Sequence, residues 1–173
     1  YDGARDPHGL LQKYWHLFPR GPVVDIAMGN GRDAIFLSHK GLKVYGLERS
    51  REAIRIAMEA AKDAKSNISV VMGDANALPF RGGSVSGIII FYFLLRHTMT
   101  EIESLLRQGG ILMYETFLKR QNTIDRWRNP EYLLDDGELL RYFENLDILF
   151  YEEVVSYADG KGKAVARLVG RRK

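Results

Sequence analysis

Short apolar runs alternate with longer amphipathic segments along most of this chain. Runs rich in β-branched residues predict buried strands at 23–27, 42–47, 67–72, 84–93 and 111–117. Between them, apolar residues spaced three and four apart predict helices at 8–18 and 34–39, after Ser50 and after Thr98. Strands that alternate with helices in this way require a parallel sheet with right-handed crossovers.

The end of the chain departs from this alternation. Residues 118–134 are polar and predict an excursion over the surface, and a short helix follows. Two strand-like runs, 147–157 and 162–169, are joined by Asp159-Gly160 and predict a hairpin. The expected fold class is therefore α/β: a single Rossmann-like, doubly wound, mostly parallel seven-stranded sheet with an antiparallel strand from the C-terminal hairpin. We expect an N-terminal arm and packing or lid helix over 1–21, and the cofactor-binding domain over 22–173.

Several helix starts carry local signals. Ser50 is a good N-cap, and Thr98-x-x-Glu101 and Asp135-x-x-Glu138 both match the capping box. A further pair, Gly109-Gly110, predicts a turn before the strand at 111–117.

The segment VVDIAMGNGRD, residues 23–33, holds the most specific chemistry. It begins as a buried strand that contains Asp25, and the two glycines Gly29 and Gly31 then allow positive φ angles and close approach of the backbone to a ligand. A helix is expected to begin near Arg32 or Asp33. A strand, a glycine-rich turn and a helix N-terminus together predict a site for a nucleotide-like cofactor.

Two cofactors fit this segment. Gly29-x-Gly31-x-x-Ala34, with Glu48 after the next strand, matches the fingerprint of dinucleotide binders and predicts NAD(P). However, Asp25 would repel a pyrophosphate, whereas it would attract a ligand that bears an ammonium and a sulfonium. Asp74, after the third strand, could accept a hydrogen bond from the amine of an adenine. These acids favour S-adenosylmethionine (SAM).

The motifs taken together resemble a known family. VVDIAMGNGRDA, a strand that ends in Glu48, VVMGDANALPF and a strand that runs into FYFL resemble the class I SAM-dependent methyltransferases in the same order. FYFLLRH, LMYETF and GELLRYF further resemble the small tellurite-resistance (TehB-like) methyltransferases. This resemblance implies SAM as cofactor and S-adenosylhomocysteine as product. It implies a cofactor site made of Asp25, Ala27, Gly29, Gly31, Glu48, Arg49, Asp74, Ala75 and Phe91.

The same resemblance implies transfer of a methyl group to a small-molecule acceptor, by in-line displacement at the C-terminal ends of the fourth and fifth strands. The acceptor could be an oxyanion of tellurium or selenium, or a small organic nucleophile. Tyr92, His97 and Glu115 are the catalytic candidates, since an acceptor that must lose a proton needs a base. Arg96 could orient an anionic acceptor, and Glu115 could instead pair with Arg96 or Arg126. The alternatives are an NAD(P)-dependent oxidoreductase and a non-catalytic SAM- or nucleotide-binding domain.

Composition excludes several other classes of function and partner. The chain has no cysteine, which excludes disulfides, thiol chemistry and Cys-ligated zinc, and its four histidines show no ligand spacing, so no metal is expected. No apolar stretch approaches the roughly 20 residues that span a bilayer. The net charge of +3 is mild, and FYFL replaces the [DN]PP[YF] clamp of base methyltransferases, which argues against nucleic acid as a partner. We expect a cytoplasmic monomer or homodimer.

Overall fold

Seven strands form one sheet in this protein. The computed structural model describes residues 6–158 and 160–173, so arm residues 1–5 and the turn residue Asp159 lie outside the described residues. The strands are β1 (Pro22–Ile26), β2 (Lys43–Glu48), β3 (Ile68–Met72), β4 (Val85–Phe91), β5 (Leu106–Phe117), β6 (Asp147–Ala158) and β7 (Lys161–Arg171).

The strands are hydrogen-bonded in the order β3-β2-β1-β4-β5-β7-β6. Pairs are parallel from β3 to β5, whereas β7 runs antiparallel to both β5 and β6. The predicted fold class is therefore confirmed, down to the antiparallel strand supplied by the C-terminal hairpin. The strand order reverses between β1 and β4, which is the place where open α/β sheets bind their ligands.

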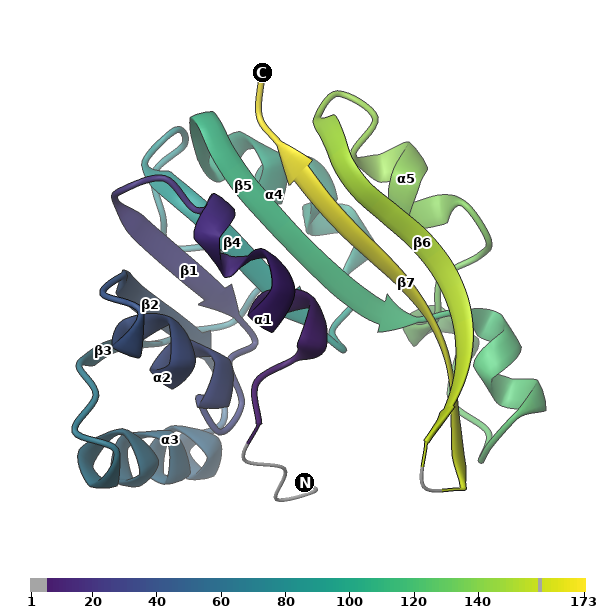
Figure 1. The fold of residues 1–173 in the computed structure, drawn as a ribbon, viewed down its shortest axis with the longest axis horizontal. Coiled ribbons are helices and arrows are strands. Elements are labelled where there is room, and N and C mark those ends of the chain that lie inside the picture. The colour runs from purple at the N-terminus through teal and green to yellow at the C-terminus, as the bar shows by residue number, and fades with distance from the viewer. Residues whose placement is uncertain (1–5, 159) are drawn as a thin grey trace.

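Helices cover both faces of the sheet (Figure 1). They are α1 (Gly9–Tyr14), α2 (Arg32–His39), α3 (Arg51–Asp63), α4 (Met99–Leu105) and α5 (Glu138–Tyr142), with shorter 3₁₀ segments η1 (Trp15–Leu17), η2 (Arg96–Thr98), η3 (Lys119–Thr123) and η4 (Pro130–Tyr132). Apolar residues of α1, α2 and α3 share one buried cluster, and those of α4 and α5 share the other.

Strand β4 lies at the centre and is buried along its whole length. Ile88 and Ile90 join the cluster under α4 and α5, whereas Ile89 and Phe91 join the cluster under α1, α2 and α3. This alternation is the two-residue period of a strand. It explains why the sequence of β4 is apolar throughout, as expected for a parallel strand that is covered on both faces.

The helix starts match the sequence signals unevenly. Ser50 caps α3 as predicted, because its hydroxyl oxygen accepts a hydrogen bond from the Ala53 N–H at 3.2 Å. The capping box predicted at Thr98 is wrong. A 3₁₀ turn, η2, precedes α4, and the Thr98 hydroxyl donates to the Leu95 carbonyl at 2.8 Å instead of accepting from the helix.

The second predicted capping box forms only in part. Glu138 accepts a hydrogen bond from the Asp135 N–H at 2.7 Å, as the box requires. The N-cap of α5 is nevertheless Gly137, with φ of 71°, and the Asp135 carboxylate binds Lys119 instead. The helix therefore starts later than the motif predicts.

The turn predicted at Gly109-Gly110 falls inside β5, which begins earlier than expected, at Leu106. Gly109 has a left-handed φ of 76°, and the β4–β5 register shifts between the pairs Val85–Leu106 and Gly87–Ile111, so the chain bends at the glycines before the regular ladder resumes. The Gly109 N–H donates to the Arg172 carbonyl at 2.8 Å, and the Arg172 N–H donates to the Gly110 carbonyl at 2.9 Å. The end of the chain thus supplies hydrogen-bond partners for both glycines.

Gly31 occupies the N-cap of α2 with φ of 78°, and a Cβ atom there would lie 2.9 Å from the Ala57 Cβ on α3. Gly31→Ala therefore combines a left-handed backbone, which costs about 1–2 kcal/mol, with a steric clash. Gly41→Ala is a matched control, since Gly41 has φ of 82° and a Cβ atom added to it would have nothing within 4 Å. We expect urea unfolding to show a larger loss of stability for Gly31→Ala than for Gly41→Ala. Equal losses would mean that α2 and α3 are not packed this closely.

Candidate active site

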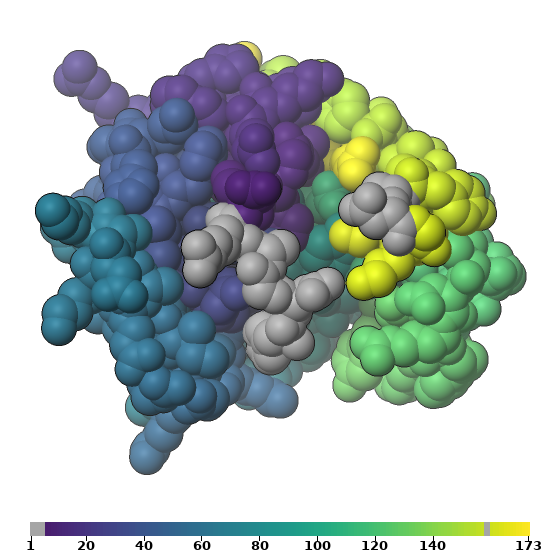
Figure 2. Space-filling model, turned by 60° about the horizontal axis from the view of Figure 1, so that its bottom comes forward, coloured from purple at the N-terminus to yellow at the C-terminus, as the bar shows by residue number. Residues whose placement is uncertain are grey.

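A cavity of about 880 Å³ opens at the C-terminal ends of β1, β2, β3 and β4. Figure 2 shows the surface hollowed between the segments coloured purple to blue and those coloured green to yellow. Residues that follow β1, β2 and β3 line one part of the cavity, and residues that follow β4 and β5 line the other. The cavity thus lies where the strand order reverses.

The floor of the cavity contains a buried acid. Asp25 is 3% exposed, and its Oδ2 atom has no hydrogen-bond partner. Burial is the main cause that raises the pKa of Asp25 well above its usual value, and repulsion by Asp33 and Glu48 adds to it, whereas Arg32 acts in the opposite direction. Because an unpaired buried carboxylate is costly, this atom is a ready acceptor for a cationic ligand.

Glu48 connects the two loops that border this acid. One carboxylate oxygen accepts the Gly29 N–H at 2.9 Å, and the other accepts the N–H groups of Arg49 and Ser50 at 2.9 and 2.8 Å. A carboxylate has about four acceptor positions, so one is left for a ligand. The loop backbone is bent for this contact: Gly29 has φ of 60°, and Ala27 has φ of 59° although it is not a glycine.

Asp74 lies at the end of β3, 3.6 Å from the guanidinium of Arg49. Its Oδ1 atom accepts hydrogen bonds from the backbone and side chain of Asn76 at 2.9 and 2.7 Å. The backbone bond from Asn76 is the main cause that lowers the pKa of Asp74. Asp74 is therefore charged at neutral pH, and its Oδ2 atom is the one that lies 3.6 Å from Arg49 Nη1.

At the other part of the cavity, Tyr92 follows β4 in a left-handed conformation, with φ of 54°. Its hydroxyl donates to Glu115 Oε1 at 2.6 Å, and Arg167 Nε donates to Glu115 Oε2 at 2.7 Å. Burial, followed by the charge of Glu115, raises the pKa of Tyr92 far above its usual value. Tyr92 is thus a protonated hydrogen-bond donor, and both oxygens of Glu115 are already engaged.

His8, just before α1, closes one side of the cavity. Its ring stacks on Phe91 with 4.1 Å between the centroids, and its Nδ1 donates to Asp33 Oδ2 at 2.7 Å. Arg32 donates to the remaining ring nitrogen, Nε2, at 2.5 Å. The segment before α1 is thereby attached to the N-terminus of α2.

Comparison with known proteins identifies the family. The family described as "Methyltransferase domain" matches residues 23–110, which run from β1 into β5 and include the glycine-rich loop, Glu48 and Asp74. The chain belongs to this family. This confirms the prediction of a class I SAM-dependent methyltransferase domain with SAM as its cofactor.

Two individual relatives and one solved structure also resemble this chain. The demethylmenaquinone methyltransferase of Lactococcus lactis is 36% identical over 98 residues, which are 51% of this chain and 38% of that protein. Hemagglutinin 1 of Eikenella corrodens is 22% identical over 174 residues, covering 94% of this chain and 57% of that protein. The crystal structure of TehB from Haemophilus influenzae superimposes with a TM-score of 0.83 at 19% identity, covering 96% of this chain and 62% of that one, and shows the shared fold. The chain thus spans less than two thirds of the length of each of these relatives.

The methyltransferase domain brings most of the predicted site residues together. The cavity is lined by Asp25, Ala27, Gly29, Glu48, Arg49, Asp74, Ala75, Phe91 and Tyr92. Three predicted residues do not line it: Gly31, His97 and Glu115. Gly31 caps α2 behind the loop, and Glu115 is buried beneath Tyr92. His97 is exposed in η2.

Neither of the arginines expected near Glu115 is its partner. Arg96 binds Glu138 at 2.6 Å and the Leu133 carbonyl at 2.7 Å, so it ties the polar excursion to α5. The partner of Glu115 is Arg167 on β7, which no sequence motif indicates. Its position opposite Glu115 in the β5–β7 ladder is the signal that could have identified it, once the strand order was known.

Other lining residues also escape prediction from the sequence. His8 is there only one of four histidines without metal-ligand spacing, and its contact with Asp33 joins residues 25 apart in sequence. Lys163 lies on the final strand, with no motif around it. Among the described residues, no group of three or more histidines and acids could hold a metal ion, and no helix among them is long and apolar enough to cross a membrane.

The raised pKa of Asp25 gives a prediction for stability. An acid whose pKa is higher in the folded than in the unfolded protein stabilises the fold only at low pH, and this contribution is lost as the pH rises through the folded value. Asp25→Asn removes the buried charge, so we expect it to stabilise the protein by about 1–3 kcal/mol at pH 8. The gain should shrink towards pH 4, near the usual pKa of an aspartate.

Urea unfolding at pH 4 and at pH 8 measures this difference. Asp74→Asn is the matched control, because the pKa of Asp74 is lowered and its replacement should give no gain at pH 8. A loss of stability for Asp25→Asn at pH 8 would show that the carboxylate has a partner in solution.

Proposed function

We propose that this chain transfers the methyl group of SAM to a small-molecule acceptor bound at the C-terminal ends of β4 and β5. The observation that carries the proposal is the unpartnered Oδ2 atom of Asp25, buried on the floor of a cavity at the switch point of the sheet. A methyl donor that bears an ammonium and a sulfonium supplies the positive charge that this atom lacks. A dinucleotide would instead bring a pyrophosphate towards three acids, Asp25, Glu48 and Asp74, which Coulomb repulsion disfavours.

The lining residues fit each part of such a donor. Asp25 faces the methionine ammonium, and the backbone after Ala27 and at Gly29 approaches the methionine chain. Glu48 accepts from a ribose hydroxyl through its one remaining acceptor position. Asp74 accepts the adenine amine through Oδ2, while Ala75 and Arg49 border the ring. Arg32, at the start of α2, faces the methionine carboxylate.

SAM, when bound, supplies an activated methyl group for in-line displacement. The remaining work of the chain is to align the acceptor with that methyl group and to exclude water. Phe91 and His8 form an apolar wall at the junction of the two parts of the cavity. Tyr92 is held by Glu115 and donates to it, so it shapes the acceptor part without removing a proton.

Calorimetric titration with S-adenosylhomocysteine tests the cofactor site. Wild-type protein should bind with a stoichiometry of one, and Glu48→Ala should bind more weakly by about 2 kcal/mol, roughly 30-fold, because charge-assisted hydrogen bonds are lost. Glu52→Ala is the control, since Glu52 is exposed on α3 and pairs with Arg55 outside the cavity. Unchanged affinity for Glu48→Ala would refute the ribose assignment.

Release of S-adenosylhomocysteine from SAM tests turnover across a panel of small thiols, phenols and carboxylates. Formation of S-adenosylhomocysteine with any acceptor of the panel supports the proposed methyltransferase activity. Binding without turnover across the whole panel would favour the non-catalytic SAM-binding domain, and binding of NAD(H) without SAM would favour the oxidoreductase.

A further inference from the structure

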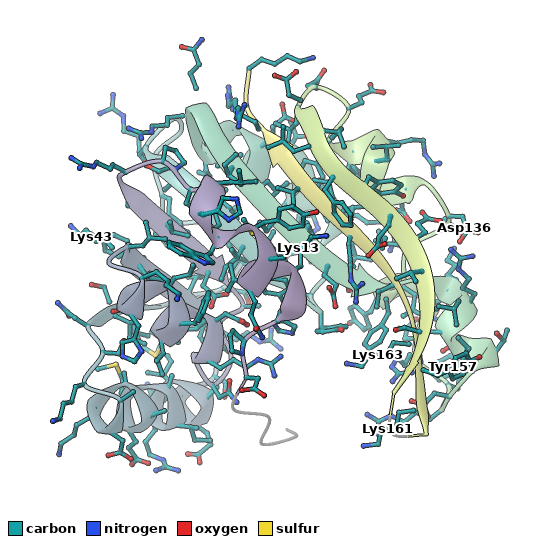
Figure 3. The ribbon with its side chains drawn as sticks, viewed as in Figure 1. Lys13, Lys43, Asp136, Tyr157, Lys161 and Lys163 are labelled. Carbon is teal, nitrogen blue, oxygen red and sulfur yellow. The ribbon has the colours of Figure 1, made fainter. Side chains whose placement is uncertain are left out.

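The methionine end of SAM bears a carboxylate beside its ammonium, so a site for it needs a cation as well as an acid. Three arginine or lysine side chains of the described residues line the cavity: Arg32, Arg49 and Lys163. Arg49 is exposed and lies 3.6 Å from Asp74, and Lys163 belongs to β7, near the hairpin end of that strand (Figure 3). Arg32 is the cation beside the buried acid, since its charge lowers the pKa of Asp25.

Arg32 is held by the segment that precedes α1. Its Nη2 atom donates a hydrogen bond to the Nε2 atom of His8 at 2.5 Å, and its Nε atom lies 3.6 Å from Asp33 Oδ2. A guanidinium has five N–H donors in a planar fork, which is more than these two partners use. The Arg32 side chain is 26% exposed and lines the cavity, so its remaining donors are accessible to a ligand.

Asp33 in turn fixes His8 through both carboxylate oxygens. Oδ1 accepts the backbone N–H of His8 at 2.9 Å, and Oδ2 accepts from the ring Nδ1 at 2.7 Å. A neutral imidazole carries one proton, so donation from Nδ1 leaves Nε2 as the acceptor that Arg32 requires. The ring also stacks on Phe91. Asp33 therefore sets both the place and the tautomer of the ring that binds Arg32.

From these contacts we propose that His8 is a positioning residue of the cofactor site. It orients the guanidinium of Arg32 towards the methionine carboxylate, while Asp25 receives the ammonium. The segment before α1 thereby completes the part of the cavity that follows β1, β2 and β3, which we call the cofactor part. The proposal rests on the SAM-dependent function proposed above and assigns to its site a residue from outside the glycine-rich motif.

Two ligands distinguish this role from a general contribution of His8 to the fold. S-Adenosylhomocysteine carries the ammonium and the carboxylate of the amino acid. The related thioether 5′-methylthioadenosine shares the adenosine and the sulfur but lacks both charged groups. A hydrogen bond that acts through Arg32 affects affinity for the first ligand alone, whereas damage to the cavity wall weakens binding of both.

Calorimetric titration of His8→Asn and His8→Gln with these two ligands tests the proposal. Both variants lose the ring that stacks on Phe91. The Asn amide lies where Nδ1 was and still donates to Asp33, whereas the longer Gln amide reaches the position of Nε2 and still accepts from Arg32. We expect His8→Asn to bind S-adenosylhomocysteine about fivefold or more weakly than His8→Gln does, because a hydrogen bond to a charged group is lost. Their affinities for 5′-methylthioadenosine should agree within about twofold.

A second background and a control variant complete the experiment. In Arg32→Met the difference between His8→Asn and His8→Gln should disappear, because residues that act on one another are not additive. His39→Asn is the matched control. His39 is exposed at the end of α2, where its ring contacts the Ala64 carbonyl outside the cavity, so both affinities should be unchanged.

The outcomes separate this inference from the proposed function. Failure of wild-type protein to bind S-adenosylhomocysteine would refute the function itself. If it binds, then equal affinity of wild-type protein for the two ligands would overturn the proposal, since no amino acid group would be recognised. Equal affinity of His8→Asn and His8→Gln for S-adenosylhomocysteine, an equal difference for both ligands, or a difference that persists in Arg32→Met would overturn it as well.

Discussion

The burial of one unpaired carboxylate at the point where the sheet reverses its strand order is the constraint around which this site is built. Asp25 lies on β1, at the centre of the parallel part of the sheet, where it pairs with Gly46 on β2 and Ile89 on β4. A fold that places an acid there loses stability, because desolvation disfavours the charge. The loss is offset only when a cationic ligand binds, so the cofactor part of the cavity is prepared for a ligand of that charge.

The neighbouring contacts fix the geometry around that acid. Glu48 holds the loop after β1 through the Gly29 N–H and holds the start of α3 through the Ser50 N–H. His8 attaches the segment before α1 to Asp33 on α2. These bonds connect parts of the chain that are distant in sequence, so the cavity walls are positioned before any ligand binds. Such preorganisation reduces the ordering that binding must impose.

Much of this structure could be predicted from the sequence because its signals are local. The β-branched runs located β1 to β4. Residues at or just after the C-terminal ends of those strands lie at one edge of a parallel sheet, as Asp25, Glu48 and Asp74 do. Pairings that depend on strand order could not be predicted: Glu115 was expected beside Arg96 or Arg126, and it meets Arg167 because β7 lies next to β5. Lys163 was missed for the same reason. The Thr98 capping box failed because a 3₁₀ turn, which has no distinct sequence pattern, uses the threonine first.

The two parts of the cavity differ in how their acids are partnered. Asp25 in the cofactor part has an oxygen without a partner, whereas both oxygens of Glu115, beneath Tyr92, are engaged by Tyr92 and Arg167. A structure of the protein with bound S-adenosylhomocysteine would test the role of Asp25 most directly. We expect the methionine ammonium to lie within about 3.2 Å of an Asp25 carboxylate oxygen. A methionine chain that points away from an Asp25 still without a partner would contradict the cofactor assignment.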